Sequence, residues 1–163
     1  MYTCKGDRTF CPVPVFAPRG AAGHILYRAQ PRTKGRNDMI PVNKLVDVFY
    51  TMLGWPYASP GTNGPAGIDC SGAFVYAYKQ FGERIYHGSN RIVRVYCHDV
   101  RRVTSASQLR VGMAIFKARE DTSHMKAEYK PGGRYYDPNL PYDYYHIGLV
   151  LSLIHISEPT RPE

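Results

Sequence analysis

The chain of 163 residues has no apolar run that approaches the roughly 20 residues of a membrane-spanning helix. Its first residues contain no apolar core of the kind found in signal peptides. Internal repeats are missing, and so are Cys-x-x-Cys, His-Glu-x-x-His and deaminase patterns. We therefore expect no metal and no cofactor. The length and a hydrophobic content of 44% are ordinary for one globular domain.

Cysteine is also scarce. Four cysteines do not make a disulfide framework at this length, although Cys4 and Cys11 lie close enough in the sequence to pair. Cys97 precedes His98, but no zinc pattern accompanies this pair, and we interpret Cys97 as a core residue near the end of a helix. Cys70 is the remaining cysteine, and its surroundings are distinctive.

Acidic residues are few in the first 40 positions, which hold seven Lys or Arg and two Asp or Glu, a net charge of +5 out of the +8 of the chain. Prolines interrupt this segment and its apolar residues show little periodicity. We interpret residues 1–40 as a basic, poorly ordered arm. Its charge favours anionic polymers, and the alternative is a solvated tail with no partner. Without an aromatic platform or a binding motif, we expect no specific binding of nucleic acid.

The most informative segment is Gly67–Gly82, which places Cys70 where a glycine-rich loop becomes a helix. Its apolar residues share one helical face, and Asp69 or Ser71 can cap the start of a helix that Gly82 ends. A thiol at a helix amino terminus meets free N–H groups and the positive end of the helix dipole, which favour the thiolate. The alternative is a buried cysteine that only packs.

Two further segments accompany this cysteine. Residues 145–152 alternate and predict a strand with His146 at its start and Gly148 leaving room beside it. A cysteine on a helix and a histidine on a distant strand can meet in the fold as nucleophile and base. Upstream, Tyr57 precedes the glycine-rich loop, and its hydroxyl is a candidate oxyanion donor. The alternative for Tyr57 is an ordinary half-buried tyrosine.

Together these motifs resemble the NlpC/P60 cysteine peptidases, which are papain-like bacterial cell-wall hydrolases. The matching motifs are Pro56-Tyr57, Asp69-Cys70-Ser71-Gly72 and His146-Ile147-Gly148, and the resemblance covers about residues 41–152. It implies an α+β fold in which amino-terminal helices, one with the nucleophile at its start, pack on an antiparallel sheet that carries the histidine.

The resemblance also implies hydrolysis of peptide bonds in peptidoglycan stem peptides. Cys70 would be the nucleophile and His146 the general base, with Tyr57, Asp69 and Ser71 binding the substrate. The basic arm would then meet anionic wall polymers. A wall hydrolase without a signal peptide would reach the wall through phage lysis, a phage tail or a secretion machine, unless the amino terminus is incomplete.

Two segments match the family less closely. Residues 109–116 resemble a family segment, but Val111 and Met113 stand where Pro and Asp are usual, which we expect to affect a turn. Residues 86–91 lie where family members often carry a short segment at the rim of the substrate site.

The third member of a triad is in doubt. The family places a polar residue roughly a dozen positions after the base, where it orients the imidazole. His155 is near that spacing, but residues 153–163 resemble a translated adapter sequence, and we interpret them as a foreign or disordered tail. Two alternatives therefore stay open. One is an impaired papain-like domain that binds wall fragments, and the other is an amidase or acyltransferase on the same Cys–His layout.

The remaining elements follow from periodicity. Apolar residues from Val42 to Leu53 predict a helix that Gly54 stops, and a shorter helix begins near Ser89. A strand is expected over residues 111–117. Residues 118–145 form a tyrosine-rich insertion, which we interpret either as a lip beside the site or as a hairpin that only covers the core.

Overall fold

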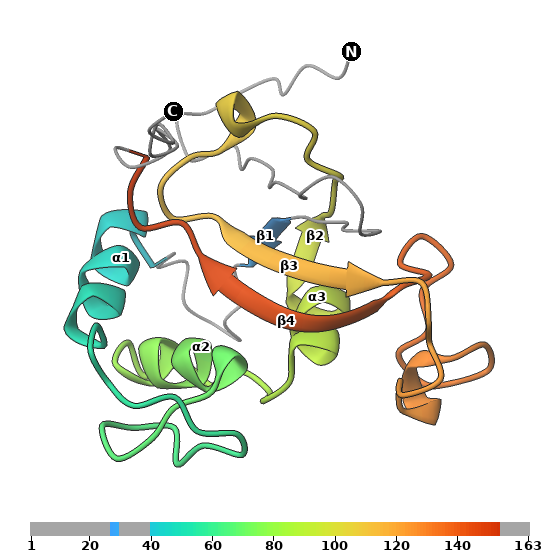
Figure 1. The fold of residues 1–163 in the computed structure, drawn as a ribbon, viewed down its shortest axis with the longest axis horizontal. Coiled ribbons are helices and arrows are strands. Elements are labelled where there is room, and N and C mark those ends of the chain that lie inside the picture. The colour runs from blue at the N-terminus through green and yellow to red at the C-terminus, as the bar shows by residue number, and fades with distance from the viewer. Residues whose placement is uncertain (1–26, 30–39, 154–163) are drawn as a thin grey trace, which may run out of the picture.

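The computed structural model describes residues 27–29 and 40–153 of the chain (Figure 1). Its elements are β1 (Tyr27–Ala29), α1 (Val42–Thr51), α2 (Cys70–Lys79), α3 (Ser89–Tyr96), β2 (Cys97–Asp99), β3 (Ala114–Arg119) and β4 (Asp143–Leu149), with short 3₁₀ helices at Ala106–Gln108 and Ala127–Tyr129. The chain is thus a small α+β protein, as expected. Cys4, Cys11, His155 and most of the basic arm and of the tail lie outside the described residues.

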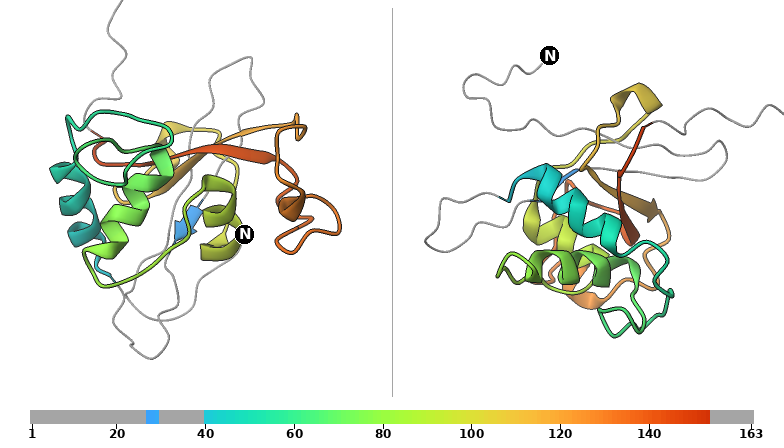
Figure 2. Two further views of the ribbon diagram at one scale, coloured as in Figure 1. Left: turned by 90° about the horizontal axis from the view of Figure 1, so that it is seen from below. Right: turned by 90° about the vertical axis from the view of Figure 1, so that its left-hand side faces the viewer.

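Two antiparallel strand pairs form the β structure of the described residues. β3 pairs with β4 from Ala114↔Leu149 to Arg119↔Asp143, and β1 pairs with β2. Strand β1 was not predicted from the sequence. Figures 1 and 2 show the three helices gathered around the β3–β4 ribbon, and both α2 and α3 contact β4.

Helix α1 presents Leu45, Val46 and Phe49 to the core, as the periodicity predicts. The ring of Phe49 meets that of Phe74 of α2 edge to face, with centroids 4.9 Å apart. Leu53 was expected on the same apolar face, and this prediction is wrong. The helix ends at Thr51, and Leu53 lies beyond it with 63% of its surface exposed.

Helix α2 follows the predicted pattern closely. Asp69 is its N-cap, and the Asp69 carboxylate accepts a hydrogen bond from the Gly72 N–H at 2.7 Å. Gly82 follows the helix with φ +75°, a conformation that only glycine adopts at little cost. The sequence therefore located both ends of the element that carries Cys70 to within a few residues.

Strand β3 begins at Ala114 rather than at the predicted Val111. The chain turns before the strand, where Gly112 has φ +87° and approaches Val42 so closely that a Cβ at this position would clash with it. Val111 lies in this turn, and Met113 follows it and is buried.

Strand β4 begins two residues before the predicted Tyr145 and contains a bulge. Lys117 pairs with His146, but Ala118 pairs with Tyr144, which leaves Tyr145 as the extra residue. Tyr144 and Ile147 are consequently both buried, with the exposed Tyr145 and the half-buried His146 between them. Simple alternation fails here because the bulge shifts the face that each residue presents.

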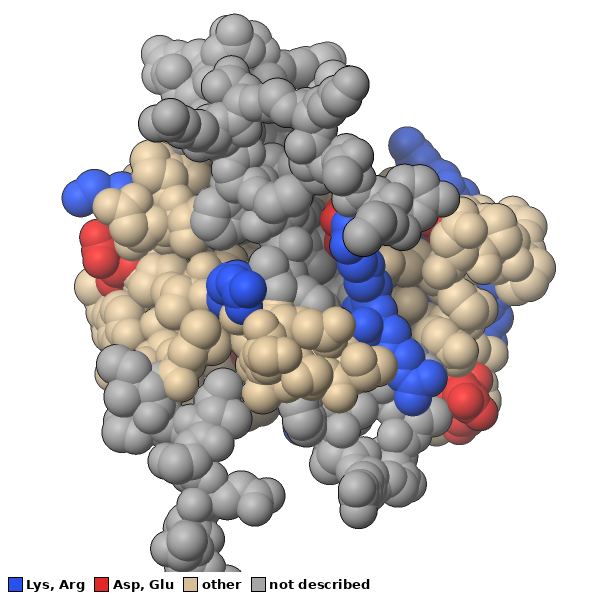
Figure 3. Space-filling model, turned by 90° about the horizontal axis from the view of Figure 1, so that it is seen from above, with Lys and Arg blue, Asp and Glu red and all other residues tan. Residues whose placement is uncertain are grey.

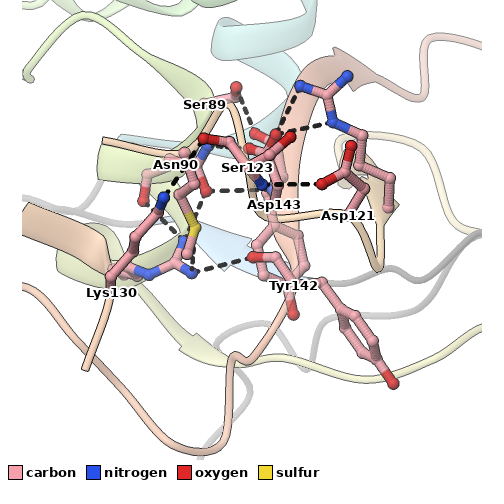
Figure 4. Close-up of polar contacts among 11 residues, drawn as sticks. Ser89, Asn90, Asp121, Ser123, Lys130, Tyr142 and Asp143 are labelled. Atoms are coloured by element: carbon pink, nitrogen blue, oxygen red, sulfur yellow. Dashed lines mark hydrogen bonds and ion pairs between the residues drawn. The ribbon is translucent and has the colours of Figure 1, made fainter. Parts of the chain in front are cut away.

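The insertion connects the two antiparallel strands β3 and β4, and it folds against α3. The Arg94 guanidinium donates hydrogen bonds to the carbonyl oxygens of Leu140 and Tyr142, at 2.9 and 3.0 Å. Figure 4 shows the surrounding network, in which the Asn90 amide donates to the Asp143 carboxylate at 2.6 Å. Contact between the insertion and a ligand stays a prediction.

Candidate active site

Cys70 is the first residue of α2 and is half-buried. The preceding loop folds back on itself, since the Ile68 N–H donates to the Pro56 carbonyl and the Ala58 N–H donates to the Ile68 carbonyl. These bonds make a parallel bridge between Tyr57 and Ile68. The loop thereby brings Tyr57 to the start of the helix.

Tyr57 is directly beside the thiol. Its pKa is raised by partial burial and by the nearby Cys70 and Asp69, and its side chain lies within hydrogen-bonding reach of Cys70. The ring is nevertheless 65% exposed, so an incoming molecule can touch it. The structure therefore brings together four of the five residues predicted for the site: Tyr57, Asp69, Cys70 and Ser71.

Asp69 is only 5% exposed, and its carboxylate accepts several hydrogen bonds. Besides Gly72, the Ser71 hydroxyl donates to Oδ1 at 3.0 Å. The Nε2 atom of His87 lies 2.9 Å from Oδ1 and 2.8 Å from Oδ2. Burial raises the pKa of Asp69, but the bonds from Gly72, His87 and Ser71 outweigh it and lower the pKa overall. A substrate would have to displace one of these donors to reach the carboxylate.

His87 is the site residue that sequence reasoning missed. It belongs to the segment that we assigned to the rim, but no spacing rule connects it with Asp69, 18 residues earlier. The following Gly88 has φ +117°, which lets the chain turn before α3. The only available signal was a polar histidine in a short loop between two helices.

His146 lies on β4, opposite Lys117 of β3. Partial burial and, secondly, the Lys117 charge lower the pKa of the imidazole. A neutral imidazole is the form that accepts a proton as a general base. Because α2 contacts β4, the elements that carry Cys70 and His146 are neighbours, and the direct pairing of the two side chains stays a prediction.

Few contacts of the His146 side chain are defined by hydrogen bonds or by its neighbour Gly148. A Cβ at Gly148 would meet no atom within 4 Å, consistent with the expected room beside the histidine. Within residues 27–29 and 40–153, no side chain makes a hydrogen bond to His146. An orienting third residue of a triad is therefore not found in this part of the chain.

Replacing Lys117 with methionine should raise the pKa of His146 towards its ordinary value, by a few tenths of a unit for a partly exposed charge. NMR titration of the imidazole measures this shift, with Lys126→Met as the control for an exposed lysine. The lowered pKa also affects stability. Below about pH 6.5 the unfolded chain holds a proton that the folded chain rejects, so stability falls as pH falls. An unchanged titration in Lys117→Met would contradict the assigned cause.

Cys97 is a core residue, as predicted. It follows α3 directly as the first residue of β2 and is 9% exposed. Burial raises the pKa of its thiol well above the ordinary range. Its thiol is therefore expected to be inert, in contrast to the half-buried Cys70.

Comparison of the chain with protein-family models, with curated proteins and with solved structures finds no match. Among the described residues, no group of three or more His, Cys, Asp or Glu side chains is arranged to hold a metal ion. The helices described above are also too short or too polar to cross a membrane.

One face of the molecule carries a short row of Lys and Arg side chains, with Asp and Glu side chains nearby (Figure 3). Positive charge in such a row would attract an anionic polymer, as the charge of residues 1–40 is also expected to do. Binding of an anionic wall polymer stays a prediction.

Proposed function

We propose that the chain is a cysteine peptidase with an NlpC/P60-like, papain-like core that hydrolyses peptide bonds in peptidoglycan stem peptides. The observation that carries the proposal is the position of Cys70. Cys70 is the first residue of helix α2, next to the ionised N-cap residue Asp69, and its thiol lies within hydrogen-bonding reach of the Tyr57 hydroxyl. This arrangement supplies a nucleophile and a candidate oxyanion donor at one place.

The chemistry would proceed by acyl transfer. The Cys70 sulfur attacks the peptide carbonyl carbon as His146 takes the thiol proton. The Cys70 N–H and the Tyr57 hydroxyl would stabilise the oxyanion. The carbon–nitrogen bond then breaks as His146 returns the proton to the leaving amine, which leaves a thioester on Cys70. Water attacks this thioester with His146 as the base, releasing the carboxylate and the free thiol.

A second candidate is a domain of the same layout that binds wall fragments without cleaving them. The favouring observation is that no side chain of the described residues hydrogen-bonds to His146. An imidazole without an orienting partner is a weaker catalyst, because its ring and tautomer are not held for proton transfer. An amidase or acyltransferase would use the same two residues and differ only in the bond that it acts on.

Digestion of purified peptidoglycan distinguishes these functions. A peptidase should release free amines, and mass spectrometry should find shortened stem peptides. An amidase would instead release intact stems from the glycan. A domain that only binds would sediment with the peptidoglycan and release nothing, which would contradict the proposed peptidase activity.

A further inference from the structure

His87 is held against Asp69 by geometry that also fixes its tautomer. A carboxylate accepts hydrogen bonds and cannot donate one while ionised, so the proton between the two residues must be on Nε2 of His87. Nδ1 is then the acceptor of the neutral ring. The His87 side chain is 44% exposed, whereas the Asp69 side chain is 6% exposed. The imidazole therefore covers the carboxylate and faces outward beside the start of α2.

The residue before His87 belongs to an aromatic stack. The Arg91 guanidinium lies between the rings of Tyr86 and Tyr135, 4.4 and 3.7 Å from their centroids. Arg91 also pairs with Glu128 at 3.1 Å, and only 12% of its side chain is exposed. Tyr135 and Glu128 both come from the insertion between β3 and β4, so the insertion holds Arg91 from two directions.

The backbone at Tyr86 is held separately. Its N–H donates a hydrogen bond to the Tyr96 hydroxyl at 3.1 Å, which ties the loop to the far end of α3. Together, the stack and this bond fix the residue that directly precedes His87. A continuous series of contacts thus runs from the insertion through Arg91 and Tyr86 to His87, and on to Asp69 at the helix start.

We propose that His87 is a positioning residue for the cysteine site and that the insertion, acting through Arg91, holds His87 in place, a role that rests on the proposed function of Cys70. Asp69 caps α2 with one oxygen atom, and His87 bonds to both oxygen atoms. Without His87 the carboxylate loses its partner on Oδ2 and can rotate. One hydrogen-bond donor fewer then stabilises the negative charge of Asp69 beside Cys70, which disfavours the thiolate.

Substitutions of His87 test the first half of this proposal. His87→Ala should slow alkylation of Cys70 by iodoacetamide at pH 7 several-fold, and should lower kcat more than it raises KM for a stem peptide. His87→Gln should restore most of both rates, because its amide can donate to Asp69. Melting temperatures establish that each variant is folded.

Substitutions of Arg91 test the second half. NMR of ¹⁵N-labelled protein reports the His87 Nε2–H directly and requires no enzymatic activity. Arg91→Lys keeps the charge but loses the planar group that stacks on the tyrosine rings. It should weaken or exchange-broaden the signal of the His87 Nε2–H. It should also slow the alkylation of Cys70, as His87→Ala does. Arg134→Lys is the matched control, because Arg134 also lies over the Tyr135 ring, at 5.3 Å, but belongs to the insertion and not to α3.

The outcomes separate this proposal from the peptidase function. One outcome is that the wild-type protein cleaves no peptide bond, while His87→Ala and Arg91→Lys both slow the alkylation of Cys70. The peptidase function then fails and the positioning role stands. If a folded His87→Ala variant keeps the wild-type alkylation and turnover rates, the positioning role is wrong. An unchanged His87 signal in Arg91→Lys would overturn the role of the insertion.

Discussion

Replacing Cys70 with serine should abolish the release of free amines from peptidoglycan, with a loss of about a thousandfold or more. A serine hydroxyl is a much weaker nucleophile than a cysteine thiol in the same position. The substitution changes one atom of a half-buried side chain, so the fold should be retained. Colorimetric amine release from purified peptidoglycan measures the effect, and the melting temperature verifies folding.

The matched control is Cys97→Ser, the same substitution at the other cysteine of the described residues. It should leave the specific activity nearly unchanged, although a hydroxyl in the core will lower stability somewhat. Iodoacetamide at neutral pH should likewise label Cys70 before Cys97, because burial raises the pKa of the Cys97 thiol. Equal loss of activity in both folded variants would reject Cys70 as the nucleophile.

Replacing Arg94 with methionine should lower the free energy of unfolding by about 3 kcal/mol. The change leaves the Leu140 and Tyr142 carbonyl oxygens without their shared donor and removes the hydrogen bond to the Asn90 side chain, at 2.7 Å. Methionine fills much of the same space, so the loss reports mainly on polar contacts. Denaturation by urea measures it.

Arg84→Met provides the comparison, because Arg84 is exposed and lies outside this network. Its effect should stay within about 0.5 kcal/mol. If Arg94→Met were as stable as Arg84→Met, the insertion would not depend on Arg94 for its attachment to α3. The view of the insertion as a part of the fold would then be wrong.

The helices were predictable because each depends on local signals. In α2, Asp69 as cap, a stripe of apolar residues and Gly82 all agree on one element. The same signals placed Cys70 at the helix start. Tyr57 was predictable as well, since a short loop joins it to that helix.

Other features could not be predicted from local patterns. The bulge at Tyr145 has no sequence signature, so the alternation predicted a strand only from Tyr145 on, two residues after its observed start. His87 meets Asp69 across 18 residues of chain, a contact that no local pattern marks. The pairing of Lys117 with His146 depends on strand register across a long insertion, which periodicity alone does not give.

The most direct test of the central claim, that Cys70 and His146 act as nucleophile and base, is the kcat/KM of His146→Gln for a defined stem peptide at pH 7. Glutamine has a similar size but cannot exchange a proton. We predict a loss of at least about a hundredfold in a folded variant. A folded His146→Gln protein with the wild-type kcat/KM would contradict the assignment of His146 as the base.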